Sequence, residues 1–597
     1  MTTLSSRLLK SSLLPLLSAV VILLSWARAA ETSAARPITI CNPFDLSYRF
    51  MLKLPSYREA ADPTIIFFHG EYWLFASKSG GYWHSPDFVH WTFVEPTGLP
   101  IESWAPTVET INDHLYFATT RSGIYTTDDP AQGHWTLVSK DLDVGHDADL
   151  FLDDDGRLYL YTGCSSTRPI GGAELDMKNF FKPMAPLLPL IVSDPLHRGW
   201  EASRTEWDGS PTLSSPSDPA KDTAGSPLRP YIEGSWMNKI NGRYYLQYAS
   251  PATENATYGD GVFVSDHPLG PFVYQNYSPF SFKPTGFTRG AGHGSTFKDA
   301  KGNYWHVATI MLSRRDKFER RIGVYPVKIF PDGQMACNTY LGDYPQYPPG
   351  SVTGSFESNS PGWMLLSLNK PVKASSELPD HPAALAVDED MRKWWAAATR
   401  NSGEWFQVDL QSKCRIEAFQ LDFADEGSHQ VGRLRSDAYQ YLVEVSDDGV
   451  AWKTALDRKA NVQDAPTDYA QLDAPVMGRY VRVTNFHAPA GALFSLSGLR
   501  VFGNALGALP DQTKEITAQR DPKDDRSVHV SWVKSSRAEF YIVRYGIKPD
   551  RLFSNFQVYD ATHLDIPVLN SGTPYFVTVD AINGSGITPG PKAVSAD

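Results

Sequence analysis

One phrase recurs five times in the first half of this sequence: an ionisable or small residue, a short apolar run, a turn and an aromatic-rich run. Each copy predicts a β-hairpin, and a hairpin this small can bury its faces only by stacking on its neighbours. An all-β unit that repeats every few tens of residues is typical of propeller blades. The sequence therefore predicts a five-bladed β-propeller, with copies that start at Asp62, Ala105, Asp147, Glu233 and His293.

The first position of this repeat is predicted to lie near the axis of the propeller, because the equivalent residue of each inner strand faces the centre. Asp62, Asp147, Glu233 and His293 would then surround one cavity. Ionised groups crowded in this way repel one another and lose hydration, a cost tolerated mainly where function or a bound cation requires it. This convergence is the main reason to expect an enzyme.

Composition restricts the classes of fold and of partner that remain possible for this chain. A chain of 597 residues exceeds what one hydrophobic core supports, so two to four domains are expected. Aromatic residues at 12%, with 44 Gly and 44 Pro, favour strands and turns over long helices. The excess of 67 acidic over 55 basic residues, a net charge of −12, argues against a nucleic acid as partner.

The N-terminus has the order of a secretory signal peptide. Arg7 and Lys10 precede an apolar run over about 13–26, and Ala27-Arg28-Ala29 follows it. We expect cleavage near Ala29, so that residues 1–29 are removed and the protein is secreted or periplasmic; the alternative is an uncleaved anchor. No later stretch is apolar and long enough to span a bilayer.

Two features of the propeller region remain open from the sequence. Cys41 precedes the first repeat and Cys337 follows the fifth, so they form either a disulfide across the ring closure or two buried thiols. The fourth copy follows the third by twice the usual spacing, which indicates an insertion between 163 and 231. Its Ser-, Pro- and Asp-rich part, about 208–230, predicts a long loop that either walls a binding pocket or is disordered.

The axial carboxylates have the composition that glycoside hydrolysis needs. One carboxyl group must be protonated to release the leaving group, and another must be ionised to activate water or attack carbon. Glu233 and Asp62 can fill these places, and Asp147 would raise the pKa of the acid by like-charge repulsion. The competing interpretation is structural, since Asp and His at strand starts also fasten blades through hydrogen bonds.

Other residues have weaker signals. His293 could orient water, supply one ligand to an axial cation, or be a hydrogen-bonded core histidine. Among the aromatic residues, Trp104 is the best candidate to stack on a sugar face, because it directly precedes the axial Ala105; Tyr72, Trp73, Trp236 and Phe287 are better explained as core. Arg289 could bind a substrate hydroxyl, although a surface or structural arginine is the better explanation. Asp153-Asp154-Asp155-Gly156 predicts a hairpin turn rather than a calcium loop.

Two further β-sandwich domains are expected after the propeller, which we place at 38–350. From 368 to 503 short alternating strands such as Trp405-Phe-Gln-Val-Asp-Leu410 indicate one sandwich. From 511 to 597 three more alternating strands, among them Phe540-Tyr-Ile-Val-Arg-Tyr545, indicate a second, smaller one.

Several of these motifs resemble known families. Ala61-Asp62-Pro63, Trp104-Ala105-Pro106, Glu233-Gly234 and Gly292-His293-Gly294-Ser295 resemble glycoside hydrolase family 43, and Asp147 lies six residues before Asp153-Asp-Asp-Gly as in that family. The resemblance implies an inverting enzyme with Asp62 as general base, Glu233 as general acid, Asp147 as pKa modulator and His293 near an axial calcium or water. Asp147-Ala148 stands where the family usually has Asp-Pro, so Asp149 is an alternative to Asp147.

Residues 368–503 resemble a discoidin-type (coagulation factor type C) domain similar to carbohydrate-binding module family 32, on motifs such as Trp394-Trp395 and Gly403-Glu-Trp-Phe-Gln-Val-Asp-Leu410. The tail resembles fibronectin type III, with Tyr575 at the place of a corner tyrosine. These resemblances support the two sandwich folds. They leave open whether the discoidin-like domain binds galactose-like sugars or only braces the propeller.

The leading hypothesis is an exported, exo-acting α-L-arabinofuranosidase whose partner is an oligo- or polysaccharide. A β-D-xylosidase or a galactan-directed enzyme of the same fold is the alternative within the family, because pocket contacts rather than the acid and base distinguish them. A non-catalytic glycan-binding propeller is the alternative outside it. Calcium is the one cofactor the resemblance suggests, and the sequence leaves the oligomeric state open.

Overall fold

The computed structural model describes residues 36–139, 141–203 and 228–596. The predicted signal peptide and most of the predicted loop at 208–230 lie outside these ranges. Within them the regular structure is almost entirely β, and the only helical elements are short 3-10 turns such as η2 (Gly199–Glu201). No helix in the described part of the chain is long and apolar enough to cross a bilayer.

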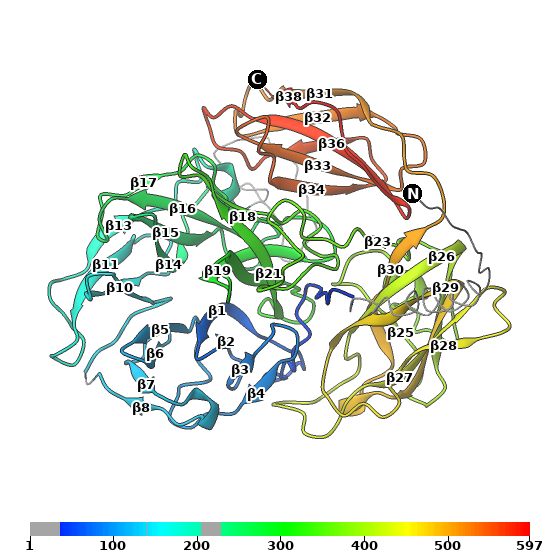
Figure 1. The fold of residues 1–597 in the computed structure, drawn as a ribbon, viewed down its shortest axis with the longest axis horizontal. Helices are drawn as coiled ribbons and strands as arrows, with labels where there is room; N and C mark the ends of the chain where they lie inside the picture. The colour runs from blue at the N-terminus through cyan, green and yellow to red at the C-terminus, as the bar shows by residue number, and fades with distance from the viewer. Residues whose placement is uncertain (1–35, 140, 204–227, 597) are drawn as a thin grey trace, which may run out of the picture. The chain divides into compact units, whose positions relative to one another are not determined.

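Five antiparallel sheets form the five predicted blades, and in each the first four strands follow one another in chain order; the additional strands β13 and β18 pair with the third strands β11 and β16. Figure 1 shows β1, β5, β14 and β19 near a common centre and β4, β8 and β17 at the periphery. The blades consist of β1 (Ala61–Phe68), β2 (Glu71–Ser77), β3 (Tyr82–Ser85) and β4 (Thr92–Val94); β5 (Thr107–Ile111), β6 (His114–Ala118), β7 (Tyr125–Thr127) and β8 (Thr136–Leu137); β9 (Asp149–Leu152), β10 (Leu158–Thr162), β11 (Ile170–Asp176), β12 (Lys182–Pro183) and β13 (Leu188–Ile191); β14 (Glu233–Ile240), β15 (Arg243–Ser250), β16 (Gly259–Ser265), β17 (Val273–Tyr274) and β18 (Ser281–Phe282); β19 (Arg289–Lys298), β20 (Tyr304–Met311), β21 (Arg320–Ile329) and β22 (Met335–Cys337).

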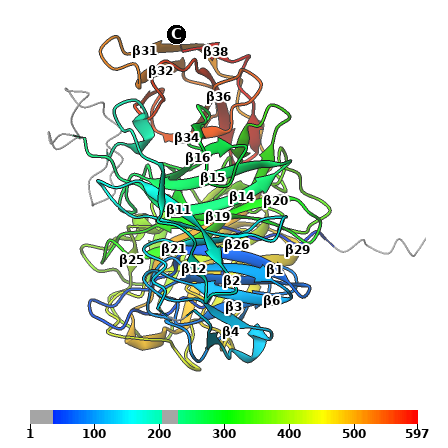
Figure 2. The same ribbon diagram turned by 90° about the vertical axis from the view of Figure 1, so that its left-hand side faces the viewer.

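Tight turns explain why each repeat folds as a hairpin. The first two strands of three blades are joined by two residues that both have positive φ: His69-Gly70, Asn112-Asp113 and Asn241-Gly242. Such turns match the right-handed twist of paired strands, and Asn, Asp and Gly tolerate the left-handed backbone. Figure 2 shows the resulting order β1, β2, β3 and β4 within the first blade. Part of the predicted insertion is also regular, because β11, β12 and β13 complete the third blade.

The first sandwich contains two long strands, β26 (Trp405–Phe423) and β29 (Thr467–His487), that pair with each other along most of their length. Its sheet order is β23-β30-β26-β29-β27-β28, with two short strands added at the sides. Alternate side chains such as Phe406, Val408 and Leu410 are buried in its core, as the sequence pattern predicts. The other strands are β23 (Met364–Leu365), β24 (Val372–Ala374), β25 (Trp395–Ala396), β27 (Gln440–Ser446), β28 (Lys453–Asp457) and β30 (Ser495–Ala505).

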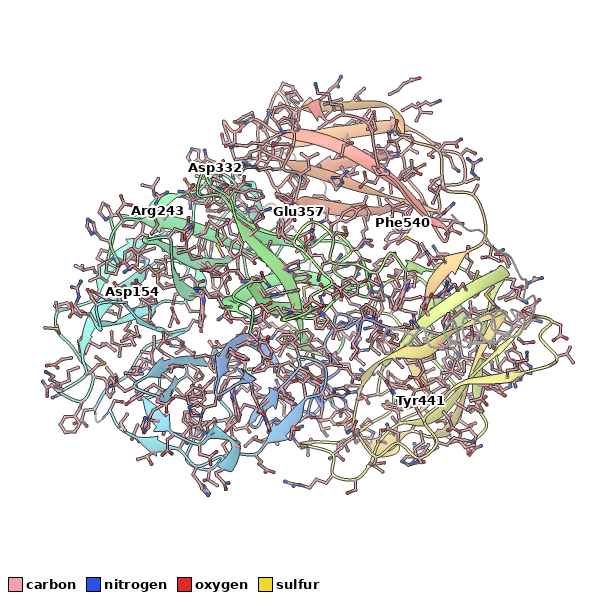
Figure 3. The ribbon with its side chains drawn as sticks, viewed as in Figure 1. Asp154, Arg243, Asp332, Glu357, Tyr441 and Phe540 are labelled. Carbon is pink, nitrogen blue, oxygen red and sulfur yellow. The ribbon has the colours of Figure 1, made fainter. Side chains whose placement is uncertain are left out.

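The tail forms two sheets, with strand orders β31-β32-β35 and β34-β33-β36-β37. Figure 3 labels Phe540 at the start of β33 and Tyr441 in β27, one residue in each sandwich, both buried. Asp332 of the last blade, also labelled there, lies 2.9 Å from Arg551 of the tail. The strands of the tail are β31 (Lys514–Arg520), β32 (Val528–Val533), β33 (Phe540–Gly546), β34 (Ser554–Tyr559), β35 (His563–Ile566), β36 (Phe576–Asn583), β37 (Gly586–Thr588) and β38 (Val594–Ser595).

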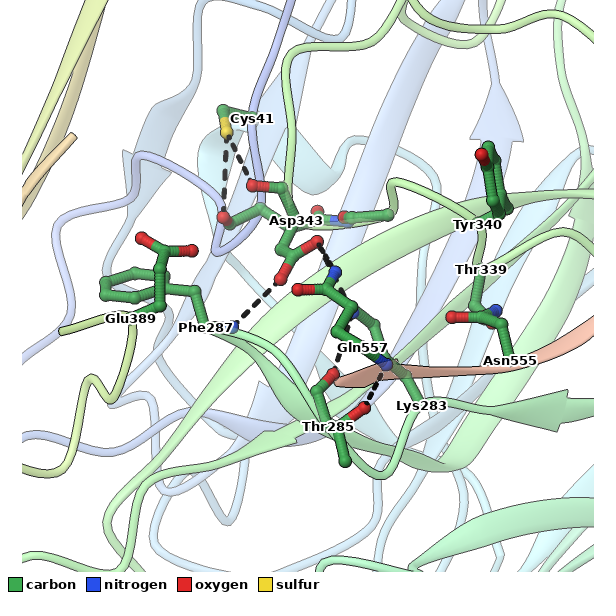
Figure 4. Close-up of polar contacts among 12 residues, drawn as sticks. Cys41, Lys283, Thr285, Phe287, Thr339, Tyr340, Asp343, Glu389, Asn555 and Gln557 are labelled. Atoms are coloured by element: carbon green, nitrogen blue, oxygen red, sulfur yellow. Dashed lines mark hydrogen bonds and ion pairs between the residues drawn. The ribbon is translucent and has the colours of Figure 1, made fainter. Parts of the chain in front are cut away.

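A buried polar cluster joins the propeller to both sandwiches (Figure 4). Asp343 after the last blade accepts hydrogen bonds from Gln557 of the tail and from the Phe287 amide, each at 2.9 Å, and lies 3.3 Å from Lys283. Its backbone oxygen accepts from Arg500 of the first sandwich and from the Cys41 thiol. Because nothing in this cluster is exposed, the hydrogen bonds replace those lost to water.

The sequence left open whether Cys41 and Cys337 form a disulfide, and in the structure they are separate thiols. Cys41, Cys337 and Cys414 are buried and free, and Cys164 is partly exposed and free. Cys41 bonds to the oxygens of Asp343 and Gln420 instead of reaching Cys337. The closure of the ring therefore rests on packing and hydrogen bonds.

Candidate active site

The start of each blade has an unusual backbone that turns its side chain toward the axis. Asp62, Ala105, Asp147 and His293 all have φ between 44° and 51°, and in the fourth copy Gly234, directly after Glu233, has φ 63°. Left-handed backbone is costly for residues other than glycine and persists where the surrounding structure imposes it. The β1–β2, β14–β15 and β19–β20 ladders show register shifts at these points, which is how a β-bulge redirects a side chain.

The redirected side chains meet in one cavity of about 600 Å³, a size typical of small-molecule sites. All four ionisable residues predicted for the axis line it, and so does Trp104. The remaining lining residues are Ser103, Thr120, Arg121, His146, Cys164, Tyr231, Ala252, Thr253, Glu254, Lys317, Phe318 and Arg320.

Asp62 is buried and held as a carboxylate. Its Oδ1 accepts from Arg320 Nη1 at 2.9 Å, its Oδ2 accepts from the Ser77 hydroxyl at 2.5 Å, and its own amide donates to Thr309 Oγ1. Burial alone would raise the pKa of Asp62, but the Arg320 guanidinium, His293 and the two hydrogen bonds together lower it below its ordinary value. An ionised carboxylate is what a general base requires.

Glu233 is in the opposite electrostatic state. Burial, followed by the charge of Asp147, raises the pKa of its carboxyl group to about 7, against the opposing effect of His293 and two tyrosines. Those tyrosines hold both oxygens: Tyr258 donates to Oε1 at 2.6 Å and Tyr231 donates to Oε2 at 2.7 Å. The group is thus fixed in direction and protonated over much of the acidic and neutral range, as a general acid must be.

Asp147 lies between these groups, whereas Asp149 does not. Asp147 accepts weakly from Thr120 at 3.3 Å, and burial raises its pKa despite the nearby His293. Asp149, the alternative from the sequence, accepts from the Met237 amide at 2.7 Å and from Thr107, and it is not among the cavity residues. The structure thus brings Asp147 to the cavity and uses Asp149 to connect two blades.

His293 sits within reach of two of the carboxylates. Its Nδ1 is 3.5 Å from Asp62 Oδ1 and 3.9 Å from Asp147 Oδ2, and its amide donates to Asp260 at 2.7 Å. Burial lowers the pKa of His293, but Asp62, Asp147 and Glu233 outweigh it, and the net shift is upward. In this position His293, when protonated, offsets the carboxylates together with Arg320.

The groups around His293 do not form a cage for calcium, which takes six to eight oxygen ligands. Both oxygens of Asp62 are already occupied by Arg320 and Ser77. The described residues contain one group of three ligand side chains with donor atoms within 4.8 Å of one another, and it consists of Asp147, Cys164 and Glu233 rather than His293. A thiol is a poor ligand for a hard cation, so this group does not suit calcium, and the calcium that the family resemblance implies near His293 stays a prediction.

The two residues predicted to bind substrate have different surroundings. Trp104 lines the cavity with 41% of its surface exposed, and the Lys78 ammonium lies 3.6 Å from the centre of its ring. Arg289 does not line the cavity and instead lies 3.9 Å from Asp390 of the first sandwich. Tyr72, Trp73 and Phe287 are buried core residues, and the Trp236 ring nitrogen donates to Thr296.

Several cavity residues had no signal in the sequence. Arg320 is the most consequential of them, because it bridges Asp62 and Glu59, and it begins the third strand of its blade rather than the repeated first strand. Tyr231 lies two residues before β14, and Tyr258, which binds Glu233 without lining the cavity, directly precedes β16, so neither occupies a repeat position. The tract Asp153–Gly156 forms the turn between β9 and β10, and Asp153 accepts from Lys239 and Tyr244.

Comparison with known proteins identifies two domain families in this chain. Residues 56–186 and 199–335 match the profile of glycosyl hydrolases family 43. The propeller is a family 43 glycosyl hydrolase domain. Residues 371–495 match the F5/8 type C domain, which confirms the discoidin-like sandwich. The protein is therefore a glycosidase with an appended discoidin-like domain.

Curated relatives of the family 43 domain differ in the sugar they are named for. A beta-D-galactofuranosidase of Aspergillus niger is 25% identical over 41% of this chain and 72% of its own length. A beta-xylosidase of Xylanibacter ruminicola is 32% identical over 25% of this chain and 42% of its own. An arabinoxylan arabinofuranohydrolase of Paenibacillus polymyxa is 30% identical over 34% of this chain and 32% of its own. The last two share less than half of their length with this chain.

Proposed function

We propose that this protein is an exported, exo-acting, inverting α-L-arabinofuranosidase that removes side chains from plant-type polysaccharides. The observation that carries the proposal is one cavity in which burial and charge keep Asp62 ionised and Glu233 protonated. Two carboxyl groups with pKa values pushed apart are what a glycosidase needs for its base and its acid.

The reaction that this arrangement favours is a single displacement. Asp62 takes a proton from a water molecule, whose oxygen attacks the anomeric carbon from the face opposite the leaving group. The bond from that carbon to the glycosidic oxygen breaks, and Glu233 gives its proton to that oxygen. Asp147 supports the acid by keeping its pKa high, and Arg320 holds the base in place. The product sugar leaves with the opposite anomeric configuration.

The choice of arabinose is supported by a relative named as an arabinoxylan arabinofuranohydrolase. A β-D-xylosidase is the second candidate, because another relative carries that name at slightly higher identity. A galactose-directed activity is the third, given the relative named as a galactofuranosidase. Contacts to the sugar hydroxyls rather than the acid and base would separate these three.

The deciding experiment incubates the protein with the 4-nitrophenyl α-L-arabinofuranoside, β-D-xylopyranoside and β-D-galactofuranoside, each in turn. NMR of the anomeric proton from the first minutes identifies the released anomer. Release of the inverted sugar from the arabinofuranoside supports the proposal. Release of the inverted sugar from only one of the other glycosides would change the proposed substrate and keep the proposed mechanism. Retention of configuration, or no release from any of them, contradicts it.

The tail is proposed to be a fibronectin type III-like domain. Its two sheets have three and four main strands, and Tyr575 before β36 accepts a hydrogen bond from the Asn570 amide, as a corner tyrosine would. Export through the N-terminal signal peptide is likewise a proposal, which N-terminal sequencing of the mature protein would test.

A further inference from the structure

One wall of the cavity comes from the loop between β20 and β21, residues 312–319, which we call the rim loop. Its Lys317 and Phe318 line the cavity, and Arg320, which binds the base Asp62, follows it directly. The Arg320 guanidinium also lies 5.2 Å from the centre of the Phe318 ring. The position of the rim loop therefore sets the shape of the cavity beside the catalytic base.

The rim loop is folded back on itself by Glu319. This buried carboxylate accepts from Arg314 Nη2 at 2.6 Å and from the Arg315 amide at 3.1 Å. The amides of Leu312 and Ser313 both donate to the backbone oxygen of Glu319 at 3.0 Å. The loop thus moves as one piece, and whatever holds its outer end also places Phe318.

The outer end of the rim loop is held by the discoidin-like domain. Arg315 Nη2 lies 3.0 Å from Glu426 Oε2, and the same oxygen accepts from Trp394 Nε1 at 3.1 Å. The Arg315 guanidinium also lies 4.8 Å from the centre of the Trp394 ring, within the range of a cation–π interaction. Glu426 is 24% exposed, so this contact is only partly screened by water.

The same segment of the discoidin-like domain also contacts the first blade close to Trp104. Arg433 donates to the backbone oxygen of Ser79 at 2.8 Å, and its guanidinium lies 3.3 Å from the centre of the Phe93 ring. Ser79 does not line the cavity, but it follows Lys78, whose ammonium lies over the exposed ring of the lining residue Trp104. Residues 426–433 of one accessory domain therefore contact the rim loop directly and lie behind a second part of the cavity.

We propose that the discoidin-like domain shapes the substrate cavity and that Glu426 is a positioning residue for substrate binding. Glu426 touches no reacting atom; it acts through Arg315 on Phe318 and Lys317. Arg320 keeps its own ties to Asp62 and Glu59, so the acid and base stay in place when Glu426 is lost. The consequence is a loss of affinity rather than of chemistry, an effect that rests on the proposed function of the cavity.

The sandwich offers a matched control. Glu444 lies 2.9 Å from Arg482, whose guanidinium lies 4.1 Å from the centre of the Trp452 ring, so this trio has the same chemistry as Glu426, Arg315 and Trp394. All three control residues belong to the discoidin-like domain and none lines the cavity. Glu444→Gln removes the same charge without touching the rim loop.

The test compares Glu426→Gln with Glu444→Gln in the full-length protein, on the glycoside that the wild type cleaves. We expect Glu426→Gln to raise KM about tenfold with kcat changed less than about twofold, since a small displacement of a binding wall weakens binding strongly. Trypsin cleavage of the native protein after Arg314, Arg315 or Lys317 should also be faster, because the loop opens more often. Glu444→Gln should change neither quantity.

Faster proteolysis without a change of KM would overturn the proposal, because the loop would be held without positioning substrate. No change in either readout, or an equal change in Glu444→Gln, would overturn it as well. If the wild type cleaves no glycoside, the proposed function fails separately. In that case calorimetric titration of both variants with L-arabinose, D-xylose and D-galactose takes the place of KM, and equal affinities overturn the positioning role.

Discussion

Buried carboxylates occur in two regions of this molecule, and the balance of charge around them differs. At the junction of the three domains, Asp343 and Glu389 face Lys283 and Arg500, two anions against two cations. At the propeller axis, Asp62, Asp147 and Glu233 share Arg320 and His293. Burial is similar in both regions, so the excess of carboxyl groups over cationic groups at the axis distinguishes a site for chemistry from a structural contact.

The causes of the pKa shifts differ between the two regions. At the junction, burial would raise the pKa of Asp343, but Lys283 and Arg500 bring it below its ordinary value, whereas burial raises the pKa of Glu389 despite Arg500. At the axis, the charge of Asp147 adds to burial in raising the pKa of Glu233, while Arg320 and His293 outweigh burial and lower that of Asp62. The third acid at the axis thus helps to keep an acid and a base apart in pKa within one cavity.

The largest expected effect is the loss of the acid or the base, and substrate choice separates the two. Glu233→Gln should lower kcat/KM about 100- to 10,000-fold on an arabino-oligosaccharide, because the leaving oxygen then departs without a proton. On a 4-nitrophenyl glycoside the loss should be much smaller, since nitrophenolate leaves readily as an anion.

Asp62→Asn is the companion variant. It should lose activity to the same degree on both kinds of substrate, because activation of water does not depend on the leaving group. Steady-state kinetics on both substrates gives the comparison, with circular dichroism as the control for folding. Equal losses on both substrates in Glu233→Gln would contradict its assignment as the acid.

The junction is expected to respond in stability rather than in activity. Arg500→Met leaves Glu389 buried without its two hydrogen bonds of 2.9 Å, and breaking a buried pair in this way costs about 3–5 kcal/mol. The free energy of unfolding should fall by this amount in denaturant titrations, while kcat of the folded enzyme stays close to wild type. An unchanged unfolding midpoint would show that the junction contributes little.

Removal of Asp147 tests the source of the raised pKa. Glu233 must be protonated to act, so activity should fall as the pH rises through about 7. Because the charge of Asp147 contributes to this raised pKa, Asp147→Asn lowers the pKa of Glu233, and the alkaline limb of the kcat/KM profile should move to lower pH. Well above pH 7 the loss should approach about tenfold for each unit of movement.

Asp149→Asn provides the control for that profile. Asp149 is buried two residues away, outside the cavity, and burial raises its own pKa to about 8. Its replacement should leave the alkaline limb where it is. A shift in this variant and none in Asp147→Asn would exchange the roles of the two residues.

The axial residues could be predicted because they occupy one position of a repeat, and a repeat can be recognised from the sequence alone. Arg320 could not be predicted from the sequence, because it begins the third strand of its blade. It contacts Asp62 only because the ring of blades closes. Arg289 precedes the bulge at Gly290 and Gly292, and it faces Asp390 of another domain rather than the cavity. Contacts such as Arg315 with Glu426 join residues of separate domains, and nothing in either local pattern indicates them.

The smallest expected effect concerns metal. Incubation with EDTA followed by gel filtration should change kcat/KM by less than about twofold, because the positive charge at the axis comes from Arg320 and His293 and both oxygens of Asp62 are already bound by protein donors. The measurement is activity before and after chelation, with readdition of CaCl₂ as the control. A large loss that calcium restores would contradict this expectation. It would mean that a bound ion balances the carboxylates at the axis in addition to the protein groups. The axis would then resemble the charge-paired cluster at the junction more than the protein groups alone indicate.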